Sequence, residues 1–329
     1  MSDRFQFSQS KVKKWRTCHL AYYLRYVERL KRKRKSRPLQ FGTMVHEMLE
    51  ADLKGDDPFE LLDELAKKQG KMFAAEIAEY GDIVEDCRLI MTAYFDFYRD
   101  DKTRPIRYKK EYAEHWLEVP IGEEMLFVMK VDAFSRTSNK RRWIEEHKTF
   151  GRMPSDDDRW RNLQSAVYIR ACEMLGMKPF DGILWNYVKS KAPKIPQLLK
   201  NGDLSIRDID TLPSVVEQVR EEHDLPVDGN YATLIERAER NVSNYFFRVF
   251  TPVKSHTVDE VFTDFLDTAH EMMEHHGKKK DRNLGMHCGW CDFEPICRAT
   301  LTGGDADFVK EREYDRKEEK DDKKNKAKG

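Results

Sequence analysis

Three charged side chains in two neighbouring apolar runs could carry hydrolytic chemistry. Asp132 ends the run VMKVDAF, and Glu146 and Lys148 follow near the end of the next run. If these runs are adjacent strands, Asp132 and Glu146 come side by side, while Glu146 and Lys148 share one face. Buried carboxylates are costly unless they are paired or bind a metal, and Mg²⁺ and Mn²⁺ prefer oxygen ligands. These residues therefore indicate a metal site, with a solvated strand end as an equally open interpretation.

Three further side chains could complete such a site. His46 lies in an amphipathic helical stretch led by Gly42, and a neutral imidazole is a common metal ligand. Gln164 and Tyr168 are four residues apart and lie on one face of the helix that follows the second strand. There they could hold a phosphate or orient the lysine. Taken singly, His46 and Tyr168 are more often core residues.

Cysteine spacing indicates a second metal centre. Three thiols lie within ten residues in the order C-x2-C-x5-C, at Cys288, Cys291 and Cys297. Thiolates this close usually share a metal, and Cys18 in the N-terminal helix is the strongest candidate for a fourth ligand. Four cysteines suit zinc or an iron–sulfur cluster about equally, and a zinc site with His287 or His19 is an alternative. The other two cysteines, Cys87 and Cys172, are interpreted as core residues.

A dense basic segment lies near the N-terminus. Between Lys11 and Arg37 there are twelve Lys or Arg and one acid, Glu28, a local charge of +11. Basic side chains neutralise phosphates, and the interleaved aromatic rings can stack on unpaired bases. We expect its loop to contact DNA with little sequence specificity, through Lys31, Arg32, Lys33, Arg34, Lys35 and Arg37. A solvated surface is the alternative.

Hydropathy periods indicate the elements that position these residues. The pattern is mostly helical from Ser8 to about Leu65, with a basic loop at 31–35 and a second helix that opens at Gly42. The period changes to two over 111–147, which predicts three successive strands. Further helices are predicted at 58–100, 156–175 and 256–276, and further strands at 182–190 and 244–253. The sequence thus predicts an α/β fold, with 191–240 as an insertion.

Length and composition bound the class of protein. The chain has 329 residues, equal numbers of basic and acidic residues, and a mean hydropathy of −0.78. We expect one domain over 1–309 and a disordered charged tail over 310–329. The sequence has no apolar run that would predict a membrane span and no apolar leader that would predict secretion. Six cysteines without such a leader favour reduced thiols and a cytoplasmic protein. The sequence contains no Walker A motif, so we expect no ATPase activity.

The motifs together resemble the RecB-like branch of the PD-(D/E)XK nucleases, over roughly residues 5–190. The resemblance rests on Gly42-x-x-x-His46, Asp132, Glu146-x-Lys148 and Gln164-x-x-x-Tyr168. It implies a restriction-endonuclease-like core, a small mixed sheet flanked by helices. It also implies that Mg²⁺ or Mn²⁺ is bound by His46, Asp132, Glu146 and the carbonyl of His147. Lys148 would position or activate water, and Gln164 and Tyr168 would contact DNA and the active site.

The four cysteines resemble the AddB-type cluster of CRISPR-associated RecB-like exonucleases and their phage relatives. This resemblance implies a [4Fe–4S] cluster held by Cys18 and the segment 285–300, which would join the two chain ends. The expected function is a metal-dependent exonuclease acting on DNA ends or single strands in a bacterial or phage-infected cell. Recombination, repair or CRISPR-adaptation proteins would be further partners. The alternatives are a non-catalytic DNA-binding adaptor and a structural zinc module.

Overall fold

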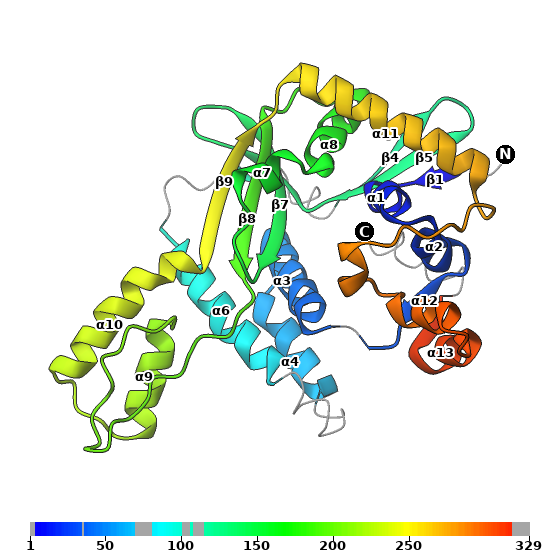
Figure 1. The fold of residues 1–329 in the computed structure, drawn as a ribbon. Coiled ribbons are helices and arrows are strands. Elements are labelled where there is room, and N and C mark those ends of the chain that lie inside the picture. Colours follow the sequence, from blue (N-terminus) through cyan, green and yellow to red (C-terminus); the bar gives the residue numbers. More distant parts are fainter. Residues whose placement is uncertain (1–3, 35, 70–80, 101–105, 108–114, 318–329) are drawn as a thin grey trace.

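A mixed five-stranded sheet forms the centre of the computed structural model, which describes residues 4–34, 36–69, 81–100, 106–107 and 115–317 (Figure 1). The strand order is β3-β6-β7-β8-β9, and only β7 and β8 are parallel. The strands are β3 (Ile106–Arg107), β6 (Ala133–Arg136), β7 (Arg142–Phe150), β8 (Gly182–Lys189) and β9 (Phe246–Pro252). Parallel strands need a crossover, and two helices between β7 and β8 supply it: α7 (Asp156–Trp160) and α8 (Leu163–Met174).

A second, three-stranded sheet continues from the first through a bend at Asp132. Its order is β1-β5-β4, with β1 (Phe5–Phe7), β4 (His115–Ile121) and β5 (Met125–Val131). The single apolar run predicted as one strand is therefore divided into β5 and β6, and Asp132 is the residue between them. The bend places this carboxylate where the chain passes from one sheet to the other.

Helices cover both faces of the five-stranded sheet (Figure 1). On one face, α8 and α11 (Ser255–His275) pack on an apolar cluster that includes Ile144, Phe150 and Trp185. On the other face are α3 (Arg37–Lys54), α4 (Pro58–Gln69) and α6 (Ile83–Phe97), whose cluster includes Val188 and Phe246. Because side chains alternate along a strand, Glu146 and Lys148 face α8, whereas His147 faces α6.

The insertion and the chain ends form peripheral units. The segment 191–240 carries α9 (Pro213–Glu222) and α10 (Gly229–Asn241), which project from the sheet (Figure 1). At the N-terminus are α1 (Gln9–Thr17), α2 (His19–Tyr22) and β2 (Leu30–Arg32). At the C-terminus are α12 (Glu294–Leu301), α13 (Ala306–Glu313) and β10 (Tyr314–Arg316). No helix in the described ranges is long and apolar enough to cross a membrane.

Three further details differ from the sequence prediction. Gly42 lies inside α3, which begins at Arg37, because Pro38 is compatible with the first turn of a helix. Lys31 and Arg32 are in strand β2 rather than in a loop, because β10 pairs with them in antiparallel register. The predicted tail is ordered through residue 317, and the rest of it, 318–329, lies outside the described residues.

Candidate active site and cysteine pocket

Asp132 and Glu146 lie side by side, as the sequence predicts. Strands β6 and β7 pair Ala133 with Glu145, which brings the two carboxylates to neighbouring cross-strand positions. Both are buried, with exposed fractions of 7% for Asp132 and 5% for Glu146. Two carboxylates so removed from water require compensating charges or hydrogen bonds.

Asp132 is held from two elements. The backbone N–H of His147 donates to its Oδ2 at 2.8 Å, and Nδ1 of His46 lies 3.4 Å from its Oδ1. His46 reaches this position because α3 approaches β7 closely at Gly42, where an added Cβ would lie 3.2 Å from Oγ1 of Thr149. A helix-interior glycine is thus explained by packing.

Glu146 is held by the residues that the sequence motif singles out. Lys148 forms an ion pair with its Oε1, and Nε2 of Gln164 donates to the same oxygen at 2.7 Å. Oε1 of Gln164 in turn lies 3.5 Å from Nζ of Lys148. Tyr168 is one turn further along α8 and is buried against this group. The structure therefore brings all of the predicted active-site side chains together.

Burial and mutual charge set the protonation of this group. Burial raises the pKa of Glu146, and the nearby Asp132 carboxylate raises it further. Burial alone would raise the pKa of Asp132, but His46, His147 and Lys148 lower it well below its ordinary value. Burial opposes the charged forms of His46 and Lys148, yet the adjacent carboxylates raise the pKa of both. The result is an ionised Asp132 beside a carboxyl that resists ionisation.

The donor set fits a hard divalent cation. Two buried carboxylates are suitable ligands for Mg²⁺ or Mn²⁺, and a cation would relieve the repulsion that raises the pKa of Glu146. Within the described residues, no three His, Cys, Asp or Glu side chains are gathered in the geometry of a bound metal. His46 instead contacts Oδ1 of Asp132, and Lys148 contacts Oε1 of Glu146.

A polar layer on the opposite face of β7 was missed by sequence reasoning. Asn186 of β8 is fully buried, and its Nδ2 lies 3.0 Å from Nδ1 of His147 and 2.9 Å from Oη of Tyr94. Arg248 of β9 donates to the same Tyr94 oxygen at 3.2 Å. The only sequence signal is an amide in the middle of the apolar strand GILWNYVK.

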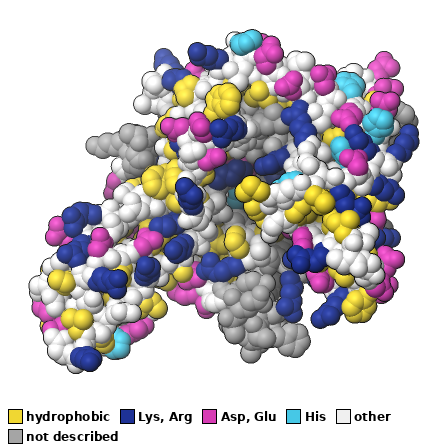
Figure 2. Space-filling view, in the orientation of Figure 1, with side chains coloured by type: hydrophobic (Ala, Val, Ile, Leu, Met, Phe, Trp, Pro, Cys, Tyr) yellow, Lys and Arg dark blue, Asp and Glu magenta, His cyan; other side chains and the backbone are white. Residues whose placement is uncertain are grey.

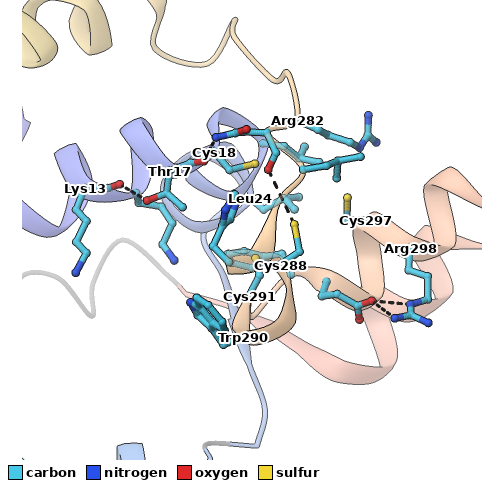
Figure 3. Close-up of a pocket in the computed structure, with 18 of the residues that line it drawn as sticks. Lys13, Thr17, Cys18, Leu24, Arg282, Cys288, Trp290, Cys291, Cys297 and Arg298 are labelled. Carbon is cyan, nitrogen blue, oxygen red and sulfur yellow. Dashed lines mark hydrogen bonds and ion pairs between the residues drawn. The ribbon is translucent and has the colours of Figure 1, made fainter. Parts of the chain in front are cut away.

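The four predicted cluster cysteines line one pocket of about 720 Å³ between the two chain ends (Figure 3). Its half-buried thiols belong to Cys18, Cys288, Cys291 and Cys297. Basic side chains, Lys13, Lys14, Arg282 and Arg298, line the same pocket, and burial raises the pKa of the Cys291 thiol. The histidine alternatives differ: His287 lines the pocket, whereas Nδ1 of His19 is 2.9 Å from Asp281. The interpretation of Cys87 and Cys172 as core residues is confirmed, since both are fully buried.

The basic residues of 31–37 are only partly available for DNA. Arg32 donates to the carbonyl of Asp292 at 3.0 Å, Lys33 to that of Glu311 at 2.7 Å, and Arg37 pairs with Asp86. Lys33 and Arg34 are nevertheless exposed, and Lys35 lies outside the described residues. Figure 2 shows Lys and Arg side chains gathered around a hollow in the middle of one face, in the region between β7 and α1.

Paired carboxylates and a lysine on neighbouring strands of a mixed α/β sheet define a class of metal-dependent nucleases. The chain belongs to the PD-(D/E)XK nuclease superfamily, whose profile matches residues 6–298. A solved structure described as the crystal structure of SSO0001 aligns with a TM-score of 0.33 and 10% identity, covering 91% of this chain and 88% of that chain. A comparison with curated proteins finds no match.

Proposed function

We propose that this protein is a metal-dependent deoxyribonuclease of the RecB-like type that digests DNA from ends or as single strands. The observation that carries the proposal is the buried pair Asp132 and Glu146 with Lys148 beside it, in a chain of the PD-(D/E)XK superfamily. When bound, Mg²⁺ or Mn²⁺ would polarise the phosphoryl oxygen and lower the pKa of a water ligand.

The chain's own residues then have distinct roles. Asp132, Glu146 and His46 hold the cation, together with the carbonyl of His147. Lys148 orients the attacking water and stabilises charge that develops on the phosphoryl group. Gln164 keeps Glu146 and Lys148 in register through its amide, which contacts both, and Tyr168 supports it from the same helix face.

We also propose that the cysteine pocket holds a [4Fe–4S] cluster with a structural role. Four thiols from both chain ends around one cavity support this assignment. Iron and acid-labile sulfide analysis of anaerobically purified protein should find about four of each per chain. Stoichiometric zinc with no visible absorption would contradict the iron–sulfur assignment and leave the nuclease proposal standing.

Digestion of end-labelled DNA tests the activity. Linear single- and double-stranded substrates should be degraded with Mg²⁺ or Mn²⁺ and remain intact with EDTA. A circular single strand of the same sequence is the matched control, because it offers no end. Its resistance would support an exonuclease, and its cleavage would indicate an endonuclease. No digestion of any substrate by metal-loaded, folded protein would contradict the proposed function.

A further inference from the structure

A row of polar side chains crosses three strands behind the candidate active site. The register of the sheet pairs His147 of β7 with Asn186 of β8, and Asn186 with Arg248 of β9. All three face α6, which contributes Tyr94 to the same layer. We call these four residues, His147, Asn186, Arg248 and Tyr94, the back row.

Asn186 is the centre of the back row. Its Nδ2 donates to Nδ1 of His147 at 3.0 Å and to Oη of Tyr94 at 2.9 Å. Arg248 donates to Tyr94 from the other side at 3.2 Å, and its guanidinium lies over the ring of Tyr98, 3.8 Å from the centroid. Asn186 therefore connects β7 to an anchor made by β9 and α6.

Stability alone does not explain this row. Asn186 and Tyr94 are 0% and 1% exposed and lie beside an apolar cluster that contains Val188 and Phe246. Well-packed apolar residues at such positions are often as stabilising as a buried polar network, or more so. A polar row that is buried at this depth is better explained by what it orients.

The back row contacts His147, which lies next to both carboxylates of the candidate site. The N–H of His147 donates to Oδ2 of Asp132 at 2.8 Å, and Glu146 precedes it directly on the strand. The hydrogen bond from Asn186 restrains the His147 ring on one face of β7, while the Glu146 side chain stands on the opposite face.

We propose that Asn186 is a positioning residue for the divalent-metal site, held by Tyr94 and Arg248 and acting through His147. The inference rests on the proposed function, since it assumes that Asp132 and Glu146 bind the cation. Partners that orient metal ligands from behind typically contribute 10–100-fold to metal affinity. Asn186 would do so without touching the cation or DNA.

Mn²⁺ binding to the full chain tests this role, measured by electron paramagnetic resonance without DNA. Asn186→Leu keeps the branched shape of the side chain and removes the donor, and Tyr94→Phe removes a single hydroxyl. We expect Mn²⁺ affinity to fall by about 10-fold or more in both. Thr211→Val is the matched control, because it also removes a buried hydroxyl, with Thr211 0% exposed. It should leave Mn²⁺ affinity unchanged.

The outcomes separate a positioning role from a structural one. A lower melting temperature in EDTA with unchanged Mn²⁺ affinity would overturn the inference, because the row would then only stabilise the fold. If Asn186→Leu does not fold, Tyr94→Phe decides. If the wild-type chain does not bind Mn²⁺, or if Asp132→Asn leaves its Mn²⁺ binding unchanged, the proposed function fails and the inference fails with it. If the wild type binds Mn²⁺ at this site and the back-row variants bind it with the same affinity, only the present inference is rejected.

Discussion

Asp132 and Glu146 share one environment but differ in how they are compensated. Asp132 accepts a backbone hydrogen bond and contacts His46, whereas Glu146 depends on the ammonium of Lys148 and the amide of Gln164. Burial and the charge of Asp132 raise the pKa of Glu146. A divalent cation would therefore stabilise the two carboxylates together more than it would stabilise either carboxylate alone.

Removing either carboxylate charge should abolish cleavage. Asp132→Asn and Glu146→Gln keep shape and hydrogen-bonding atoms but lose a metal ligand. Because a bound cation supplies several kcal/mol of transition-state stabilisation, we expect a loss of about 1,000-fold or more in single-turnover rate. DNA affinity should change only slightly. Near wild-type rates in both variants would show that the assignment of the active site is wrong.

Lys148 should separate catalysis from metal binding. Lys148→Met retains the aliphatic stem and removes the ammonium that pairs with Glu146. We expect cleavage to be lost while Mn²⁺ affinity changes much less than in Glu146→Gln, because an ammonium cannot ligate a cation. Titration calorimetry with Mn²⁺ measures the difference. Equal losses of metal affinity in the two variants would argue against a catalytic role for Lys148.

Spacing along single elements predicts part of this site and packing decides the rest. Alternation along β7 and the four-residue interval from Gln164 to Tyr168 are visible in the sequence, so the side chains around Glu146 could be anticipated. Asn186 and Tyr94 could not, because their contacts depend on the register between β7 and β8 and on how α6 packs. The amide of Asn186 within an apolar strand is visible in the sequence, but its partners are not.

At the scale of elements, α3 links the basic segment to the metal site. It begins at Arg37 and carries His46, and Gly42 lets it approach β7 at Thr149. A sequence prediction that starts the helix at Gly42 treats this glycine as a boundary. In the structure it is a contact, which follows from the position of another strand and not from local propensity.

A double-mutant cycle should detect the contact between α3 and β7. Alanine is about 1 kcal/mol better than glycine in a helix interior, but the new Cβ at position 42 would press on Oγ1 of Thr149 at 3.2 Å. Gly42→Ala should therefore stabilise a Thr149→Ala background by about 1 kcal/mol and the wild type by clearly less. Urea unfolding in EDTA measures both effects. Equal effects in the two backgrounds would mean that Thr149 does not limit this approach.

At the scale of the whole molecule, the two chain ends fold together. Strand β2 pairs with β10, and both ends contribute cysteines to one pocket. The high charge of the last residues predicts a disordered tail, but Tyr314 is buried and stacks on Phe293. Composition could not show this, because one buried aromatic ring and a short strand partner suffice to order a charged segment.

Thiol labelling should report the cluster proposed for this pocket. In cluster-free protein near pH 8, iodoacetamide should modify the half-buried pocket cysteines, Cys291 more slowly than the others because burial raises the pKa of its thiol. Cys87 and Cys172 should resist, because burial raises the pKa of each thiol to about 12. In cluster-loaded protein all four pocket cysteines should be protected, as mass spectrometry would show. Equal labelling of Cys18 in both forms would exclude it as a ligand.

The exposed part of the basic segment should contribute to DNA affinity through charge alone. Lys33 and Arg34 are exposed just before α3, and His46 lies nine residues into that helix, about 14 Å along its axis. We expect a DNA strand that crosses the metal site to reach both side chains. Each phosphate contact on single-stranded DNA adds roughly −0.7 to the slope of log affinity against log salt. The double variant Lys33→Gln and Arg34→Gln should flatten that slope and weaken binding to all sequences alike.

A charge-matched control separates contact from overall charge. Lys200 and Arg207 are also exposed but belong to the insertion with α9 and α10, which projects from the sheet (Figure 1). Lys200→Gln with Arg207→Gln removes the same two charges and should leave the slope unchanged. Cleavage at saturating DNA should match the wild type in both double variants, since none of these side chains contacts the carboxylates. An unchanged slope in the Lys33 and Arg34 variant, or equal flattening in the control, would show that the basic segment is only a solvated surface.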